Sequence, residues 1–157
     1  MDKEYQGKTA VVTGGASGVG RCLCELFAGQ GMNVVMADVE AEALEASSTV
    51  LSSQGLNVIG VQADVTNPDS MQALEAASRE AFGHVHILCN NAGVSIKEAQ
   101  RRIWSLTAND WDWGYGVNVM GIANGIRAFV PGMLAHGEKG HVVNTSSGNG
   151  GLTSMPT

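Results

Sequence analysis

Three glycines have the type and spacing needed to hold an anionic group. Gly14, Gly18 and Gly20 directly follow the short, apolar and β-branched segment 8–13. Such a segment predicts a strand that is buried on both faces. Val19, Leu23, Leu26 and Phe27 then repeat with helical spacing, which predicts that they share one face of a helix ending near residue 30. The glycines therefore lie where a strand passes into a helix.

Bare peptide groups at such a turn suit a pyrophosphate. Free N–H groups and the positive end of the helix dipole would bind it, and side chains would block its approach. The spacing of Gly14, Gly18 and Gly20 is not G-x-G-x-x-G, so the usual dinucleotide fingerprint is absent. A glycine-rich turn without a ligand is the alternative.

An acidic residue ends the second predicted strand, 33–38. Asp38 lies eighteen residues after Gly20. A carboxylate there can accept hydrogen bonds from both hydroxyls of an adenosine ribose, and it would repel a 2′-phosphate. The glycine loop and the neighbours of Asp38 contain no Arg or Lys, which favours NAD over NADP. Capping of the next predicted helix, 40–53, is the alternative role, and one carboxylate can do both.

The third predicted strand, 57–63, also ends in an acid. Asp64, followed by Val65, can accept a hydrogen bond from an adenine amino group. A turn aspartate placed before the helix-capping Asn67 is an equally good interpretation.

Small and amide side chains end the fourth predicted strand, 86–90. The run Asn90–Gly93 would let a ligand lie against the backbone, and its asparagines can tie neighbouring strands together. An ordinary Asx turn is the alternative.

These motifs recur because strands and helices alternate along the chain. Further predicted elements are a helix from Asn67 to Gly83, a long helix over 107–135 and a fifth strand over 140–144. Alternation of this kind predicts one doubly wound α/β domain over 1–157, with a Rossmann-like parallel sheet and helices on both faces. Ligands bind such sheets at the carboxyl ends of the strands.

Composition excludes several classes of protein. An apolar content of 44% with 15% charged residues excludes a disordered chain. The net charge of −6 argues against nucleic-acid binding, and no apolar run reaches the length of a membrane span. Three cysteines and four histidines lack metal-ligand spacing, so we expect no metal and a reduced, cytoplasmic setting.

Four segments, in the right order, resemble motifs of the short-chain dehydrogenases/reductases. Thr13–Gly20 looks like the TGxxxGxG cofactor loop of that family, and Asn90–Gly93 looks like its NNAG motif. Asn118 matches its long-helix asparagine, and the run 144–147 matches the end of its fifth strand. The resemblance implies hydride transfer between NAD(H) and a secondary alcohol or ketone. The expected cofactor-binding residues are Gly14, Ser17, Gly18, Val19, Gly20, Asp38, Asp64, Val65, Asn91, Ala92 and Gly93.

The resemblance also implies catalytic residues. Ser147 matches the catalytic serine better than Ser146 does, and would hydrogen-bond the substrate oxygen. Asn118 would hold a water in the proton relay, helped by a local break in its glycine-containing helix. A turn serine and a polar residue on a mostly buried helix are the respective alternatives.

One motif of the family is not found in these residues. Its general acid/base is a Tyr followed four residues later by a Lys, whereas Tyr5 and Tyr115 are followed by Thr9 and Val119. Counting on from Ser147 places the Tyr just beyond residue 157. We therefore expect a classical member truncated before this motif and its C-terminal strands. The 157 residues would be inactive, and the complete form would be an active homodimer or homotetramer. A non-catalytic dinucleotide-binding or scaffold protein is the alternative.

Three tryptophans gather at the start of the long predicted helix. For Trp104, Trp111 and Trp113 the favoured interpretation is packing in the core or in a hydrophobic staple at the helix start. A substrate mouth or an oligomer interface are the alternatives.

Overall fold

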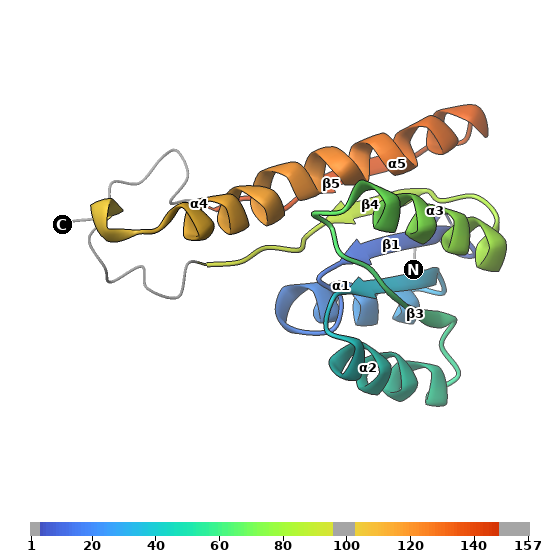
Figure 1. The fold of residues 1–157 in the computed structure, drawn as a ribbon. Helices are drawn as coiled ribbons and strands as arrows, with labels where there is room; N and C mark the ends of the chain where they lie inside the picture. The colour runs from blue at the N-terminus through green and yellow to red at the C-terminus, as the bar shows by residue number, and fades with distance from the viewer. Residues whose placement is uncertain (1–3, 96–102, 148–157) are drawn as a thin grey trace.

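Five parallel strands form a single sheet in the order β3-β2-β1-β4-β5. The computed structural model describes residues 4–95 and 103–147 (Figure 1). The strand bounds are β1 (Thr9–Thr13), β2 (Asn33–Asp38), β3 (Val58–Gln62), β4 (Ile87–Asn90) and β5 (His141–Asn144). Each strand agrees with its predicted range to within one residue at either end, and the predicted parallel sheet is confirmed.

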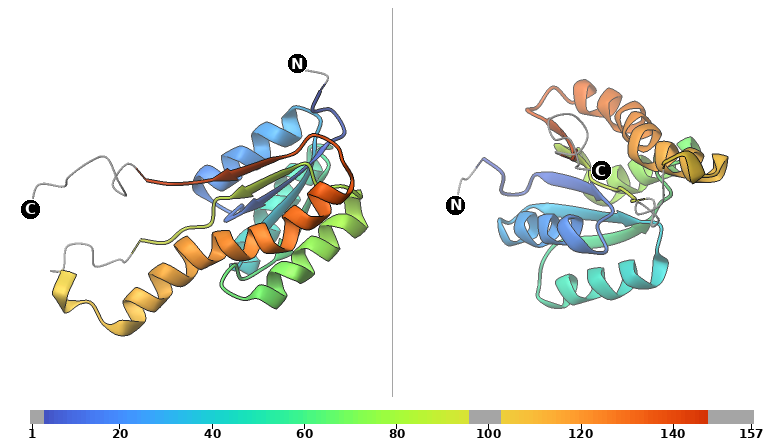
Figure 2. Two further views of the ribbon diagram at one scale, coloured as in Figure 1. Left: turned by 90° about the horizontal axis from the view of Figure 1, so that it is seen from above. Right: turned by 90° about the vertical axis from the view of Figure 1, so that its left-hand side faces the viewer.

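Helices cover both faces of the sheet, so the doubly wound architecture is confirmed. The layers are visible in Figure 2. The helices α1 (Gly18–Gly29) and α2 (Ala41–Ser53) pack on one face, and α3 (Pro68–Phe82) and α5 (Gly121–Ala135) pack on the other. The 3-10 turn η1 (Ile103–Ser105), the helix α4 (Ala108–Tyr115) and the π-helical segment η2 (Gly116–Met120) precede α5.

Local sequence explains where α3 begins and ends. The side-chain oxygen of Asn67 accepts hydrogen bonds from the amides of Asp69 and Ser70, at 2.9 and 3.3 Å. Pro68 occupies the first helical position, where its missing N–H costs nothing. Gly83, with φ 76°, ends the helix in a conformation that other residues rarely adopt.

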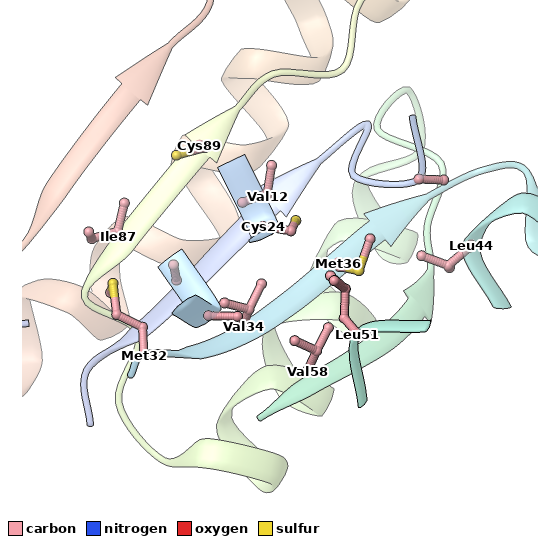
Figure 3. Packing of buried hydrophobic residues seen from close by; sticks show 13 residues of the cluster. Val12, Cys24, Met32, Val34, Met36, Leu44, Leu51, Val58, Ile87 and Cys89 are labelled. Atoms are coloured by element: carbon pink, nitrogen blue, oxygen red, sulfur yellow. The ribbon is translucent and has the colours of Figure 1, made fainter. Parts of the chain in front are cut away.

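The packing of α1 corrects the predicted helix face. Its buried residues are Gly20, Cys24 and Ala28, and of the four predicted residues Leu23 and Phe27 are partly buried against this core, whereas Val19 is 65% and Leu26 57% exposed. Small side chains let the helix backbone approach the sheet closely, so the larger apolar residues turn to its flanks. Figure 3 shows the core on this face, with Cys24 against β1 and β4. Burial raises the pKa of the Cys24 thiol to about 12, so it stays protonated.

The core of the opposite face centres on Phe129 of α5, with Met71 and Leu74 of α3. On this face α5 contacts β4 directly at Gly125, which faces Asn90. A Cβ added to Gly125 would lie 2.1 Å from Oδ1 of Asn90. The helix can therefore approach the strand this closely only where it lacks a side chain.

β5 contrasts with this core. All four of its residues are exposed, including Val142 and Val143. Because β5 is the last strand in the sheet order, one of its edges carries no described strand.

His86 and His136 lie near each other at the edge of the sheet where the strands begin. The buried His86 ring accepts a hydrogen bond at Nδ1 from the Thr9 amide, at 3.1 Å, so its proton lies on Nε2. Nε2 faces Oε2 of Glu138 at 3.3 Å, and Glu138 also pairs with Lys8. The ring of His136 lies 5.3 Å from that of His86, measured between centroids. Burial lowers the pKa of His86, so the neutral ring is the form that the fold favours.

Replacing Gly125 with Ala is expected to destabilise the fold by about 1–3 kcal/mol, the usual cost of overpacking a core. Gly132→Ala on the same helix is the matched control, since its added Cβ would come no closer than 3.5 Å, to Glu75. There the higher helix propensity of Ala should be neutral or stabilising by up to ~1 kcal/mol. Urea unfolding measures both, and equal effects would contradict the packing at Asn90.

Acid is expected to weaken the fold through His86. Its folded pKa lies below the ordinary 6.5, so the unfolded chain binds the proton more readily. Stability is therefore lost as the pH falls below about 6.5. His86→Asn keeps an acceptor for the Thr9 amide but does not titrate. Thermal unfolding at pH 7.5 and 5.5 should show a larger loss for the wild type, and parallel losses would be evidence against this role.

Candidate functional site

A cleft of about 640 Å³ opens at the carboxyl ends of the strands. Its walls come from the segments that follow β1, β2, β3 and β4, together with α4 and η2. Between β1 and β4 the chain reverses its direction of progress across the sheet, which is where such folds bind ligands. The cleft is lined by all eleven residues predicted to bind a cofactor: Gly14, Ser17, Gly18, Val19, Gly20, Asp38, Asp64, Val65, Asn91, Ala92 and Gly93.

The glycine loop packs tightly on one side and is open on the other. Gly14 has φ 64°, and an added Cβ there would lie 2.9 Å from Cα of Ala92. A Cβ on Gly20 would lie 2.0 Å from the carbonyl oxygen of Gly14. Gly18 has φ 52°, yet its added Cβ would meet no described atom within 4 Å. Gly14 and Gly20 thus let the loop close up, while Gly18 leaves bare backbone on the cleft.

The first turn of α1 also faces the cleft. Ser17 is its N-cap but makes no side-chain capping bond to the described residues, and the first turn contains no acidic residue. The first amides of a helix have no partner within that helix. The positive end of the α1 dipole is therefore available to an anion at the glycine loop.

Asp38 ties the glycine loop to the end of β2. Its Oδ2 accepts a hydrogen bond from the Ala16 amide at 3.0 Å, and its Oδ1 accepts one from the Glu40 amide at 3.2 Å. The N-cap of α2 is Glu40, not Asp38. The carboxylate is half-buried and lines the cleft, so it holds the loop while still facing that space.

Asp64 makes the contacts of a turn aspartate. Its Oδ1 accepts hydrogen bonds from the amide and the hydroxyl of Thr66, at 2.9 and 2.7 Å. The same residue is exposed and lines the cleft next to Val65. The turn interpretation is therefore observed, and Asp64 also lies on the cleft wall.

A buried hydroxyl joins β1 to the segment after β4. Oγ1 of Thr13 accepts hydrogen bonds from the amides of Asn91 and Ala92, at 3.0 and 3.1 Å. It also donates one to the carbonyl oxygen of Cys89 at 3.3 Å. In return, Nδ2 of Asn91 donates to the carbonyl oxygen of Thr13 at 3.1 Å. The ends of β1 and β4 are thus held together by side chains beyond the strand ladder.

At Asn118, where a local break was predicted, the α-helical pattern is interrupted by a π-helical segment without a break in the chain's helical course. η2 is π-helical, and the amide of Gly121 bonds the carbonyl of Gly116 five residues back. The Asn118 carboxamide accepts from the amide of Val94 at 2.8 Å and donates to its carbonyl at 2.9 Å. Asn118 therefore ties the long helix to the segment that follows β4, next to Val94 and Val117 of the cleft lining.

The structure does not bring Ser147 into the cleft. Ser147 is exposed beyond β5, and among the described residues of that segment Thr145 is the one that lines the cleft. Oγ1 of Thr145 donates to Oδ1 of Asn91 at 3.2 Å. Neither Asn118 nor Ser147 is among the described residues that line the cleft, although Asn118 lies beside Gly93 and Val94, which do.

The prediction that the three tryptophans pack in the core is wrong. Trp104, Trp111 and Trp113 are 77%, 51% and 46% exposed, and Trp113 lines the cleft. Sequence reasoning also missed several cleft residues, because their types carry no ligand-binding signal of their own. The missed residues are Val39, Glu40, Ala63, Thr66, Val94, Val117 and Thr145.

The described residues contain no group of three His, Cys, Asp or Glu side chains suited to a metal ion. Among them there is also no helix long and apolar enough to cross a membrane.

The sheet order, the crossing helices and the cleft define a Rossmann-like α/β protein of the doubly wound class. Residues 8–156 match the short chain dehydrogenase family, and the chain belongs to that family. A short-chain dehydrogenase/reductase from Burkholderia phymatum, solved in complex with NAD, is 49% identical and superposes with a TM-score of 0.92. The match covers 98% of this chain and 53% of that one.

Two further relatives are dehydrogenases. A 1-deoxy-11-beta-hydroxypentalenate dehydrogenase of Streptomyces arenae is 37% identical over 90% of this chain and 50% of its own length. Glucose 1-dehydrogenase 2 of Bacillus subtilis is 35% identical over 94% of this chain and 57% of its own length. The chain thus spans about half the length of the relatives that it matches.

Replacing Thr13 with Val is expected to destabilise the fold by about 1–3 kcal/mol, because it leaves the half-buried amides of Asn91 and Ala92 without their acceptor. Thr9→Val is the matched control on the same strand. The Thr9 hydroxyl is also buried, but has no hydrogen-bond partner in the part of the chain that the structure describes. Its removal should be neutral or stabilising. Chemical denaturation measures both, and a neutral Thr13→Val would show that the hydroxyl does not hold β1 to β4.

Proposed function

We propose that the protein is an NAD(H)-dependent oxidoreductase that interconverts a secondary alcohol and a ketone. The observation that carries the proposal is the joint placement of the bare Gly18 backbone and the Asp38 carboxylate on one cleft. The volume of about 640 Å³ lies in the range of small-molecule and cofactor sites. Family membership, the dehydrogenase relatives and the neighbour solved with NAD all support it.

The sheet order gives the bound cofactor a direction. β1, β2 and β3 lie side by side, so the glycine loop, Asp38 and Asp64 follow one another along the carboxyl edge. The pyrophosphate would bind at Gly18 and the first turn of α1, and the ribose at Asp38. The adenine would then lie at Asp64 and Val65. The nicotinamide half would extend the other way, toward β4 and β5, where Asn91, Ala92 and Gly93 line the cleft.

The preference for NAD over NADP follows from charge. Asp38 and Glu40 both line the cleft, and its described lining contains no Arg or Lys. A 2′-phosphate on the adenosine ribose would meet two carboxylates and no cation. This arrangement favours the unphosphorylated ribose.

The bound nicotinamide would supply the hydride chemistry. Ser147 would hydrogen-bond the oxygen of the substrate, and Asn118 would hold a water of the proton relay through its helix break. The 157 residues contain no Tyr-x-x-x-Lys pair, so the general acid/base of the family would be supplied from outside them. We therefore infer that these residues bind cofactor without turnover. The complete enzyme would be a cytoplasmic homodimer or homotetramer.

A non-catalytic dinucleotide-binding or scaffold protein of the same fold is the second candidate. Its support is the absence of that Tyr and Lys from the 157 residues. A Tyr-x-x-x-Lys that begins shortly after residue 157 in the complete protein would favour the enzyme, and its absence there would favour the scaffold.

Removal of the Asp38 carboxylate is expected to weaken NAD binding about ten- to a hundredfold. Each hydrogen bond to a charged group contributes about 1.5–3 kcal/mol, which sets this range. Titration calorimetry with NAD and NADP measures the effect, and the wild type should bind NAD at least tenfold more tightly. In Asp38→Ala this preference should shrink. Glu42→Ala, an exposed acid of α2 outside the cleft lining, is the control. Unchanged NAD affinity in Asp38→Ala would exclude the ribose assignment.

A further inference from the structure

Among the described residues that line the cleft, Trp113 is the aromatic one, and its side chain is half-exposed. It comes from α4, which Figure 1 shows reaching past the carboxyl ends of the strands. The start of α4 is fixed by a reciprocal capping box. The Asp110 amide donates to the Thr107 hydroxyl oxygen at 3.3 Å, and the Thr107 amide donates to the Asp110 carboxylate at 2.7 Å. The helix that carries Trp113 is thus anchored only six residues before it.

The position of the helix over the sheet edge is set by glycines. A Cβ on Gly121 would lie 2.8 Å from Cγ2 of Val65, and one on Gly116 would lie 3.6 Å from Cγ2 of Thr66. The helix therefore runs against the segment that ends β3. Trp113 precedes Gly116 by three residues and Val117 by four, so the three share one helix face. Trp113 consequently lies one turn further out along the wall formed by Val65 and Thr66.

We propose that Trp113 is a stacking platform for the adenine ring of the cofactor. The inference rests on the proposed function, which assigns the β3 end of the cleft to the adenine. A planar indole at the rim of that end can cover one face of a purine, while Val117 and Val65 offer apolar contact deeper in the cleft. An aromatic side chain held half in water favours such use, because stacking removes its apolar face from solvent.

The geometry favours adenine over nicotinamide as the partner. The wall that carries Trp113 meets the end of β3 at Gly116 and Gly121, and Trp113 lies before Gly116 in the helix, on the side away from Asn118 and its bonds to Val94. Asn91, Gly93 and Thr145 line the cleft beside β4 and β5. In the sheet order β3 and β4 are separated by two strands. At about 4.8 Å between neighbouring strands, their ends lie about 14 Å apart. The two rings of a dinucleotide laid along this edge would therefore meet different walls.

The first experiment compares the affinity of the full chain for ADP, which contains adenine, ribose and pyrophosphate but no nicotinamide. Trp113→Ala should weaken ADP binding about tenfold, within the range of base stacking on aromatic side chains. Trp113→Phe, which keeps an aromatic face, should recover most of the loss. Trp111→Ala is the matched control, since Trp111 lies on the same helix, is 51% exposed and is outside the cleft lining.

The second experiment isolates the fluorescence of Trp113 in a chain carrying Trp104→Phe and Trp111→Phe. ADP should quench this emission, because a stacked purine lies against the indole. Quenching by nicotinamide mononucleotide without quenching by ADP would overturn the proposal, and so would a response to neither ligand. Circular dichroism of each variant shows whether its fold is retained.

The outcomes separate this inference from the proposed function. If Asp38→Ala weakens ADP binding and Trp113→Ala does not, the stacking platform is wrong and the dinucleotide site stands. If the wild-type chain binds neither ADP nor NAD, both are wrong. A tenfold loss in Trp113→Ala with rescue by Phe, and no change in Trp111→Ala, supports the platform.

Discussion

Parallel pairing of β1 with both β2 and β4 is the constraint on which the cleft depends. Because the three strands run the same way, their carboxyl ends meet at one edge, and the chain must cross the sheet on a helix after each of them. The polar groups that follow the different strands therefore lie close together in space although they are far apart in the sequence. The Thr13 hydroxyl strengthens this arrangement, because it binds the amides that continue β4 and so fixes one side of the cleft relative to the glycine loop.

The second requirement is that backbone segments approach one another closely, and glycines make this possible at three positions. Gly14 and Gly20 let the loop after β1 close against the segment after β4, and Gly125 lets α5 rest on Asn90. Gly18 differs from these, because the space beside it is empty of described atoms. The same residue type thus serves packing at some positions and leaves backbone accessible at another. A sequence pattern cannot separate these uses, and the distances to an added Cβ can.

The sequence predicted the strands, the parallel sheet and eleven of the residues that line the cleft because each signal is local: a β-branched run, a glycine turn, an acid or amide at a strand end. The face of α1 was predicted only in part. Leu23 and Phe27 do pack against the core, but apolar periodicity ranked Val19 and Leu26 above the smaller Cys24 and Ala28, whereas close contact with the sheet selects small residues. Thr145 was missed as a cleft residue, and for Trp113 a substrate mouth was only an alternative to core packing, because both positions depend on how the long helix and β5 pack against distant segments. The roles of Ser147 and Asn118 remain predictions from family resemblance.

The π-helical segment η2 has a consequence for the rod formed by α4 and α5. Its wider turn accommodates one additional residue, and one residue corresponds to about 100° of rotation in an α-helix. The side chains of α4, which precedes η2, are consequently rotated about the helix axis relative to the buried face of α5. Deleting a single residue from η2 would leave Phe129 and Met133 seated in the core while swinging the Trp113 face of α4 by more than a quarter turn. The π-helical segment thus sets the rotation of α4 relative to α5, so that α5 faces the sheet while α4 presents Trp113 to the cleft.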